Sequence, residues 1–207
     1  SVSHSELVYR IKLGSGEYKS TDATVDASGK SVKDITDVTR FRNLTALLLN
    51  NNKISDISPL YTLSGLEVLE LSGNGVSDIG PLKNHTKLRV LDLMKNKIKD
   101  ITALGSCTAL TELHLSYNAE LSDISALSAC TGLTQLSLDY TAVTDLTALS
   151  ELKKLVTLSL DGCAVTDPSP LYSLSGLRTL YIGGSGLTEA QIAELSVALP
   201  KCEIYGQ

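Results

Sequence analysis

The sequence has few aromatic residues and lacks several patterns that would indicate other classes of protein. It contains no Trp, one Phe and eight Tyr, so its core must be built from Leu, Ile, Val and Ala. No apolar run approaches the roughly 18–20 residues that a membrane span requires, and no signal-peptide or lipidation pattern is seen. The 18 basic residues face 23 acidic ones, without the clustered basic excess of a nucleic-acid surface. We expect neither membrane insertion nor a nucleic-acid partner.

The sequence instead contains one phrase that recurs at a nearly constant spacing. The phrase LxxLxLxxN opens at seven leucines, separated by 22 residues except for one step of 23: Leu44, Leu66, Leu88, Leu110, Leu133, Leu155 and Leu177. A weaker copy begins 22 residues before the first of them, at Asp22. A period of this length predicts a solenoid, in which each repeat forms one coil and stacking of the coils buries a continuous core.

The first half of each repeat predicts a short strand followed by an inward polar residue. The LxL stretch alternates with period two, so stacked coils should form a parallel sheet with one strand per repeat. An Asn at the ninth position can bond the backbone where the chain turns away from the sheet. We expect this ladder to weaken toward the C-terminus, where smaller groups replace Asn. The ladder residues are Asn52, Asn74, Asn96, Asn118, Thr141, Cys163 and Ser185.

The second half of each repeat predicts a turn or two of helix on the outer side. A Ser or Thr followed by Pro or Ala, as in Ser58-Pro59 and Thr102-Ala103, is typical of an N-cap and first helical residue. An Asp shortly before each such pair is expected to cap the local backbone, because calcium needs six to eight oxygens around one ion. The extra residue of the 23-residue repeat should bulge after its strand, within 118–121, and leave the strand register intact.

The whole pattern resembles the leucine-rich repeat family, and its NxIxDIxPL phrase resembles the repeats of bacterial internalin-type surface proteins. The resemblance implies an α/β fold: a right-handed solenoid with a parallel sheet on the concave face and short helical turns on the convex face. We expect a single domain, 1–207, with eight repeats in 22–187 that start at 22, 44, 66, 88, 110, 133, 155 and 177. Residues 1–21 should form an N-terminal cap with a strand at 6–13, whereas internalins typically have a helical cap there. Residues 188–207 should form a capping helix and a last strand.

The four cysteines follow no CxxC or CxxH metal pattern. Cys107 and Cys130 occupy the same core position in adjacent repeats. They are either bonded to each other or two small buried hydrophobic residues in place of Leu, and the second interpretation is favoured because free Cys is commonly buried. The cysteines therefore do not indicate whether the protein resides in an oxidising or a reducing compartment.

The exposed sheet face collects the variable residues and is the candidate partner-binding surface. Its acidic side chains would steer a basic partner, and its tyrosines would anchor the contact because they bury much area with few rotors. The candidate partner-binding residues are Leu48, Glu70, Asp92, Met94, Glu112, His114, Tyr117, Asp139, Tyr140, Asp161 and Tyr181.

Two kinds of chemistry on this face are considered and disfavoured. Acidic residues beside His114 contain metal-ligand types, but a shallow sheet offers little geometric closure. His114 with Ser116 or Ser137 and Asp92 contains the residue types of a hydrolase, yet an open surface lacks an oxyanion hole. We expect no catalytic residue, no metal and no cofactor.

The favoured function is recognition of a protein or peptide, by a monomer that forms part of a bacterial surface or secreted protein. The alternatives are an intracellular scaffold resembling the phosphatase-regulatory leucine-rich repeats, which would be cytoplasmic, and a passive structural spacer. Fold does not decide among them. Since the only Met is Met94, Ser1 is not a translation start, and we expect a processed protein or a piece of a longer one.

Overall fold

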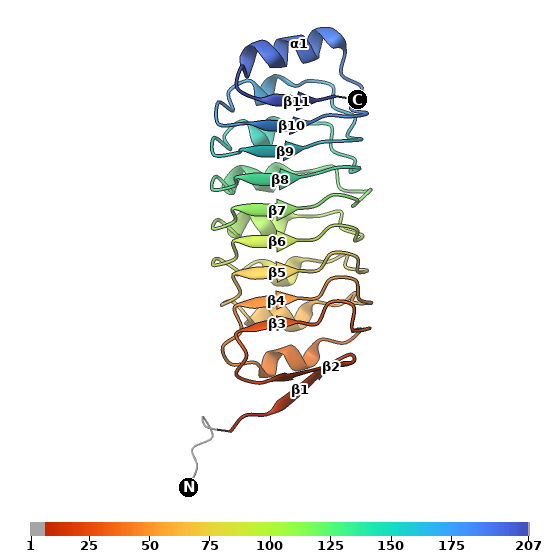
Figure 1. Cartoon of the computed structure of the whole chain (residues 1–207), viewed down its shortest axis with the longest axis vertical. Coiled ribbons are helices and arrows are strands. Elements are labelled where there is room, and N and C mark those ends of the chain that lie inside the picture. The colour runs from red at the N-terminus through yellow and green to blue at the C-terminus, as the bar shows by residue number, and fades with distance from the viewer. Residues whose placement is uncertain (1–6, 207) are drawn as a thin grey trace.

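The computed structural model describes residues 7–206, which form a stack of coils with one strand each (Figure 1). The strands build a nine-stranded parallel sheet in which spatial order follows chain order. A strand of three residues is long enough to pair in this sheet because its central residue is buried and the strands of the two adjacent coils have the same pattern. The sheet strands are β3 (Thr24–Asp26), β4 (Ala46–Leu48), β5 (Val68–Glu70), β6 (Val90–Asp92), β7 (Glu112–His114), β8 (Gln135–Ser137), β9 (Thr157–Ser159), β10 (Thr179–Tyr181) and β11 (Glu203–Tyr205).

The register of the sheet is constant through the 23-residue repeat. Leu113 of β7 pairs with Leu91 on one side and Leu136 on the other, so no strand slips. The added residue lies in the exposed turn at Ala119 and Glu120, and Leu121 then resumes the buried position. The prediction of a bulge after the strand is confirmed, because a slip would have moved the leucines to the solvent face.

The outer side of the solenoid consists of short 3-10 helices. They are η1 (Thr36–Arg40), η2 (Ser58–Thr62), η3 (Gly80–Leu82), η4 (Thr102–Ser106), η5 (Ser125–Ala129), η6 (Thr147–Leu149) and η7 (Ser169–Leu171). The prediction of Ser or Thr N-caps is wrong, since these residues open the helices and no cap residue makes a side-chain cap bond. The Asp two residues before each helix start caps the backbone instead. In η4, Asp100 Oδ1 accepts from the Thr102 N–H at 2.7 Å. Hydrogen bonds from Thr102 also lower the pKa of Asp100.

Different elements close the two ends of the coil stack (Figure 1). At the N-terminal end, β1 (Arg10–Leu13) and β2 (Gly16–Lys19) form an antiparallel hairpin that buries Ile11 and Leu13. The strand expected over 6–13 therefore starts only at Arg10, and Glu6 lies outside the described residues. At the C-terminal end, α1 (Glu189–Ala198) opens with a capping box between Thr188 and Gln191, and β11 adds the last strand beside β10.

The core is a continuous column of mostly aliphatic side chains. His85 is fully buried in the row where other coils place Phe, Leu or Cys, and neither ring nitrogen has a hydrogen-bond partner. Cys107 and Cys130 follow it in that row as free thiols, and burial raises the pKa of each to about 11. The second interpretation of the two cysteines, as small buried residues, agrees with this structure.

Candidate partner-binding face

In the first repeats, the Asn side chains of the ninth-position ladder bond the backbone just after each strand. Asn74 Oδ1 accepts from the Ile54 N–H at 3.0 Å, and its Nδ2 donates to the carbonyls of Leu49 and Leu71 at 3.0 Å each. Asn52, Asn96 and Asn118 make equivalent bonds. One amide side chain thus ties two coils together at the point where every strand ends.

The substitutes for Asn in the last coils bond less. The Thr141 hydroxyl donates to the Leu138 carbonyl at 2.7 Å, and Cys163 Sγ approaches the same carbonyl at 3.0 Å. Ser185 Oγ accepts from the Leu187 N–H at 3.4 Å. None of the three reproduces the bond that an Asn side chain accepts from the preceding coil.

The exposed face of the sheet carries mainly negative charge. It is made of the third, fifth and seventh positions of the repeats, together with the outward residues of β11, and the eighth position beside them adds Tyr117, Tyr140 and the cation Lys95. In the described part of the chain the third, fifth and seventh positions and β11 contain no Lys or Arg. Their acidic residues are Asp26, Glu70, Asp92, Glu112, Asp139, Asp161 and Glu203. Such a face repels anions and attracts cationic groups.

Several of these acids also bond the protein's own backbone, which the sequence interpretation missed. Asp139 Oδ1 accepts from the Asp161 N–H at 2.9 Å and from the Ser159 hydroxyl, and its Oδ2 accepts from the Ser116 hydroxyl at 3.1 Å. Asp161 Oδ1 in turn accepts from the Gly183 N–H at 2.7 Å. The seventh position is therefore a second ladder, and Asp139 is half-buried within it.

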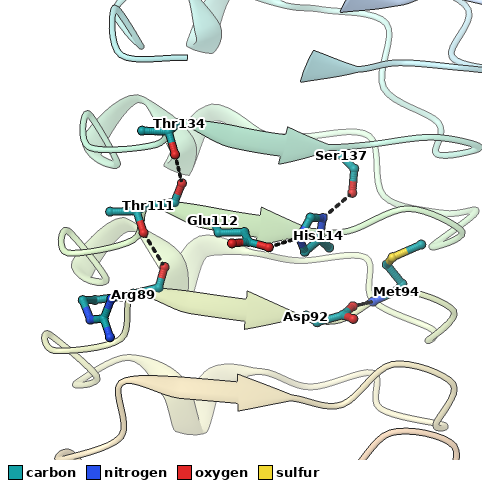
Figure 2. Close-up of polar contacts among 8 residues, drawn as sticks. All are labelled: Arg89, Asp92, Met94, Thr111, Glu112, His114, Thr134 and Ser137. Carbon is teal, nitrogen blue, oxygen red and sulfur yellow. Dashed lines mark hydrogen bonds and ion pairs between the residues drawn. The ribbon is translucent and has the colours of Figure 1, made fainter. Parts of the chain in front are cut away.

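The acids nearer the N-terminus keep more of their carboxylate free. Asp92 uses only Oδ1, which accepts from the Met94 N–H at 2.9 Å (Figure 2). Glu70 uses only Oε2, which accepts from the Asn50 side chain at 2.5 Å. Leu48 and Met94 are half-buried beside them. This part of the face is an acidic surface with a small apolar component.

Glu112, His114 and Ser137 form a hydrogen-bonded chain across β7 and β8 (Figure 2). His114 Nε2 lies 2.8 Å from Glu112 Oε1, and its Nδ1 lies 3.0 Å from Ser137 Oγ. The residue types match a serine hydrolase, but the flanking backbone N–H groups, such as those of Leu115 and Leu138, are already bonded within the sheet. Neither of these two N–H groups is available to an oxyanion.

Two tyrosines project beside this chain from strained backbone. The eighth position of every coil is left-handed, and Gly or Asn occupies most of these positions. Tyr117 and Tyr140 adopt it with φ of 63° and 52°, a conformation that costs a bulky residue about 1–2 kcal/mol. Their rings stack with centroids 5.0 Å apart and 19° between planes, while 45% and 53% of their surfaces stay exposed. Lys95 in the preceding coil has the same conformation, with φ of 53°.

The neighbours of the two tyrosines fix the ring positions. Lys95 Nζ lies 5.7 Å from the Tyr117 ring centroid on one side. On the other side the Tyr140 ring covers Gly162, where an added Cβ would meet the ring at 2.6 Å. The pair is thus packed on both sides, against Lys95 and against Gly162.

A second stacked pair lies at the C-terminal end of the face, and only half of it was expected. Tyr181 of β10 stacks on Tyr205 of β11 at 5.1 Å with 18° between planes. Tyr205 lies outside the repeats, so no repeat position marked it as exposed on this face. Its alternation with the half-buried Ile204 within the last strand was the signal available in the sequence.

Two further features are absent from the part of the chain that the structure describes. Between residues 7 and 206, no group of three or more His, Cys, Asp or Glu side chains is placed to hold a metal ion. No helix in the same range has the length and apolarity to cross a membrane.

The repeats match a family model described as leucine-rich repeats, over residues 42–84, 64–106, 86–129 and 108–151. These matches span more than half of the chain. The protein belongs to the leucine-rich repeat family. A search of the curated proteins found no match.

Solved structures place its repeats in the internalin type, as the sequence resemblance predicted. The chain is similar to an internalin (InlF) of Listeria monocytogenes, with 35% identity and a TM-score of 0.81, over 88% of this chain and 53% of that one. It is also similar to internalin C2 (InlC2) of that organism, with 32% identity and a TM-score of 0.82, over 89% and 80%. The plant peptide hormone receptor RGFR1 shares the fold alone, at 19% identity and a TM-score of 0.69, over 84% of this chain and 30% of the receptor.

Proposed function

We propose that this leucine-rich repeat protein is a non-enzymatic recognition module that binds a protein or peptide through its concave sheet face. The single observation that carries the proposal is the stacked pair of Tyr117 and Tyr140. The pair is exposed, packed on both sides and kept in a left-handed conformation that every other described coil assigns to Gly or Asn, except the coil with Lys95. A passive spacer gives no reason to retain that strain.

The partner-binding residues are proposed in two groups around this pair. Leu48, Met94, His114 and Tyr181 extend the apolar and aromatic contact. Glu70, Asp92, Glu112 and Asp161 present negative charge without any cation in their rows, which favours a basic partner and predicts weaker association at higher salt. Asp139 also belongs to the face, but its bonds to Ser116, Ser159 and Asp161 make it a support of the surface.

The similarity to internalins supports a bacterial surface or secreted setting. RGFR1, which shares the fold, is a peptide hormone receptor whose structure holds it in complex with RGF2, so a peptide-sized partner is proposed alongside a folded one. We further propose that 1–207 acts as one unit and as a monomer, with 1–21 and 188–207 as its end caps. A cytoplasmic scaffold and a spacer are the competing functions.

Partner capture with matched variants tests the proposal. Wild-type protein, a Tyr117→Ser/Tyr140→Ser double variant and a Tyr61→Ser control serve as baits for lysates and culture media. Tyr61 is 55% exposed on the outer 3-10 helix η2, so the control removes an exposed ring from the opposite side. Serine at 117 and 140 relieves backbone crowding, and the fold should persist.

Any captured protein is then purified and its affinity is measured directly for all three forms at two salt concentrations. We expect the double variant to lose at least tenfold in affinity, the control to match wild type, and binding to weaken as salt rises. Equal affinity for wild type and double variant would overturn the proposed face and leave the convex side or the caps as the binding surface.

A further inference from the structure

The C-terminal third of the concave face lies between the two tyrosine pairs, and this surface is named the basin. Tyr140 borders it on one side, and the stacked rings of Tyr181 and Tyr205 border it on the other, with 37% and 49% of their surfaces exposed. Within the described chain, both ring-stacking contacts flank this region. Successive strands lie about 4.8 Å apart, so the walls are a few strands from each other.

The floor of this basin is built from residues with little or no side chain. Gly162, Gly183 and Gly184 follow β9 and β10. The Tyr140 ring lies over Gly162, whereas no side chain fills the space above Gly184. Asp161 is the one charged side chain on the floor. Its Oδ1 accepts from the Gly183 N–H at 2.7 Å, which fixes the carboxylate, while Oδ2 makes no bond to any described residue.

The charges around the basin select the sign of its occupant. Asp139 in the preceding coil already receives two hydroxyl groups and one N–H, and its carboxylate adds negative potential beside Asp161. Glu203 lies on β11 at the far wall, where its Oε2 accepts from the Tyr205 hydroxyl at 2.8 Å. No Lys or Arg occupies the outward positions of β8 to β11 in the described structure. Only a cationic group complements this arrangement.

We propose that the basin formed by Tyr140, Asp161, Gly183, Tyr181 and Tyr205 receives an arginine side chain of a protein partner. A guanidinium is planar, stacks on tyrosine rings and donates paired hydrogen bonds to a carboxylate. A lysine ammonium is compact and strongly hydrated, so it would gain less from the aromatic walls. The inference rests on the proposed function and specifies which chemistry the partner brings to one end of the face.

Short peptides of defined charge test the basin without knowledge of the partner. Hexa-arginine, hexa-lysine and hexa-glutamate are titrated into the ¹⁵N-labelled protein, and both the dissociation constants and the amide shifts are recorded. We expect hexa-arginine to bind at least threefold more tightly than hexa-lysine and hexa-glutamate not to bind. The largest shifts should fall on the amides of Gly162, Gly183 and Gly184.

Two isosteric substitutions separate this basin from diffuse attraction to an acidic surface. Asp161→Asn and Asp56→Asn each remove one negative charge, the second from the loop before η2, and each retains the side-chain oxygen that accepts a backbone N–H. Asp161→Asn should weaken hexa-arginine binding at least fivefold, whereas Asp56→Asn should change it less than twofold. A Tyr181→Ser/Tyr205→Ser variant should also weaken it at least fivefold, with Tyr61→Ser as its control.

Equal effects of the two Asn variants, or equal binding of hexa-arginine and hexa-lysine, would overturn the assignment of an arginine site. Unchanged binding after loss of Tyr181 and Tyr205 would do the same. If the peptides do not bind but the Tyr117/Tyr140 variant still loses a captured partner, this inference fails and the proposed function stands. If the peptides do not bind and that variant keeps its partner, both the inference and the proposed function fail.

Discussion

The first and last coils of the solenoid hold the ends of their strands by different hydrogen bonds. In the coils that contain Asn52 to Asn118, one buried amide satisfies groups in two coils. In the coils that contain Thr141, Cys163 and Ser185 the inner ladder is sparse, and on the exposed side Asp139 and Asp161 accept backbone N–H groups of the following coil. The concave-side bond occurs in both regions, since Asn50 Oδ1 accepts from the Ser72 N–H at 2.9 Å, so what the last coils lose is the inner ladder.

This difference has a consequence for binding. A carboxylate that accepts a backbone N–H is held in place, so the surface of the last coils is both charged and ordered. A residue such as Asp139 then serves stability and the electrostatic field together. In the N-terminal half the neutral Asn50 makes the outer bond to the next coil, and Glu70 and Asp92 each keep one carboxylate oxygen without a bond to a described residue.

Removal of an inner amide should have the largest effect on stability. Asn96→Ala deletes bonds to the Val76 N–H and to the carbonyls of Leu71 and Leu93, and leaves buried groups unpaired. We expect the free energy of unfolding to fall by about 2–3 kcal/mol. Thr141→Ala, which deletes one bond to a carbonyl, should cost about 1 kcal/mol. Urea denaturation measures both, and equal losses would remove the distinction between the halves.

Removal of the outer carboxylate should come next. Asp139→Ala unpairs the Asp161 N–H and two hydroxyl groups, and we expect a loss of about 2 kcal/mol. Ser72 occupies the same position in an early coil and its hydroxyl makes no bond to a described residue, so Ser72→Ala should cost less than about 0.5 kcal/mol. A Tm unchanged by Asp139→Ala would mean that the carboxylate serves only the surface.

The buried imidazole of the early coils should make stability depend on pH. Burial lowers the pKa of His85, so the unfolded chain takes up a proton first as the pH falls below about 6.5. Stability is therefore fully present above that pH and is lost below it, by up to about 1.4 kcal/mol per pH unit until the folded pKa is reached. His85→Leu should raise stability by about 1–2 kcal/mol at neutral pH, since it removes two unpaired buried nitrogens.

The same substitution should also remove this acid sensitivity. Denaturation of wild type and His85→Leu at pH 7.5 and 5.5 gives the check, with Leu63→Ile in the same row as a control for packing. If both proteins lose the same stability between the two pH values, His85 does not cause the dependence.

Restoration of the inner ladder in a late coil should give the smallest effect. The Val143 N–H is buried and has no acceptor in the described structure, and Cys163 occupies the position from which an Asn would reach it. Cys163→Asn should stabilise the protein by about 0.5–1 kcal/mol. A loss of stability would show that the late coils have diverged too far to accommodate the amide.

Repetition made much of this protein predictable. The leucine spacing predicted the strands, their register and the position of the bulge in the 23-residue repeat. A solenoid coil contacts only the coils next to it, so each coil must pack in the same way. The ninth-position residues were predictable as inward groups for the same reason. The N-caps were misassigned because Ser58 and its equivalents fit cap statistics, while the bond is made by an Asp side chain that accepts from the N–H two residues later.

The sequence alone determined the period, the identity of the buried rows and the rows that face outward, since these follow from local alternation repeated in every coil. Only the tertiary structure decided what the outward residues do. The bonds of Asp139 and Asp161 run to the next coil, the tyrosines stack because their coils are adjacent, and Tyr205 joins Tyr181 through strand β11. These contacts join residues more than 20 positions apart, and their geometry depends on backbone conformations, such as the left-handed Tyr117 and Tyr140, that no local pattern specifies.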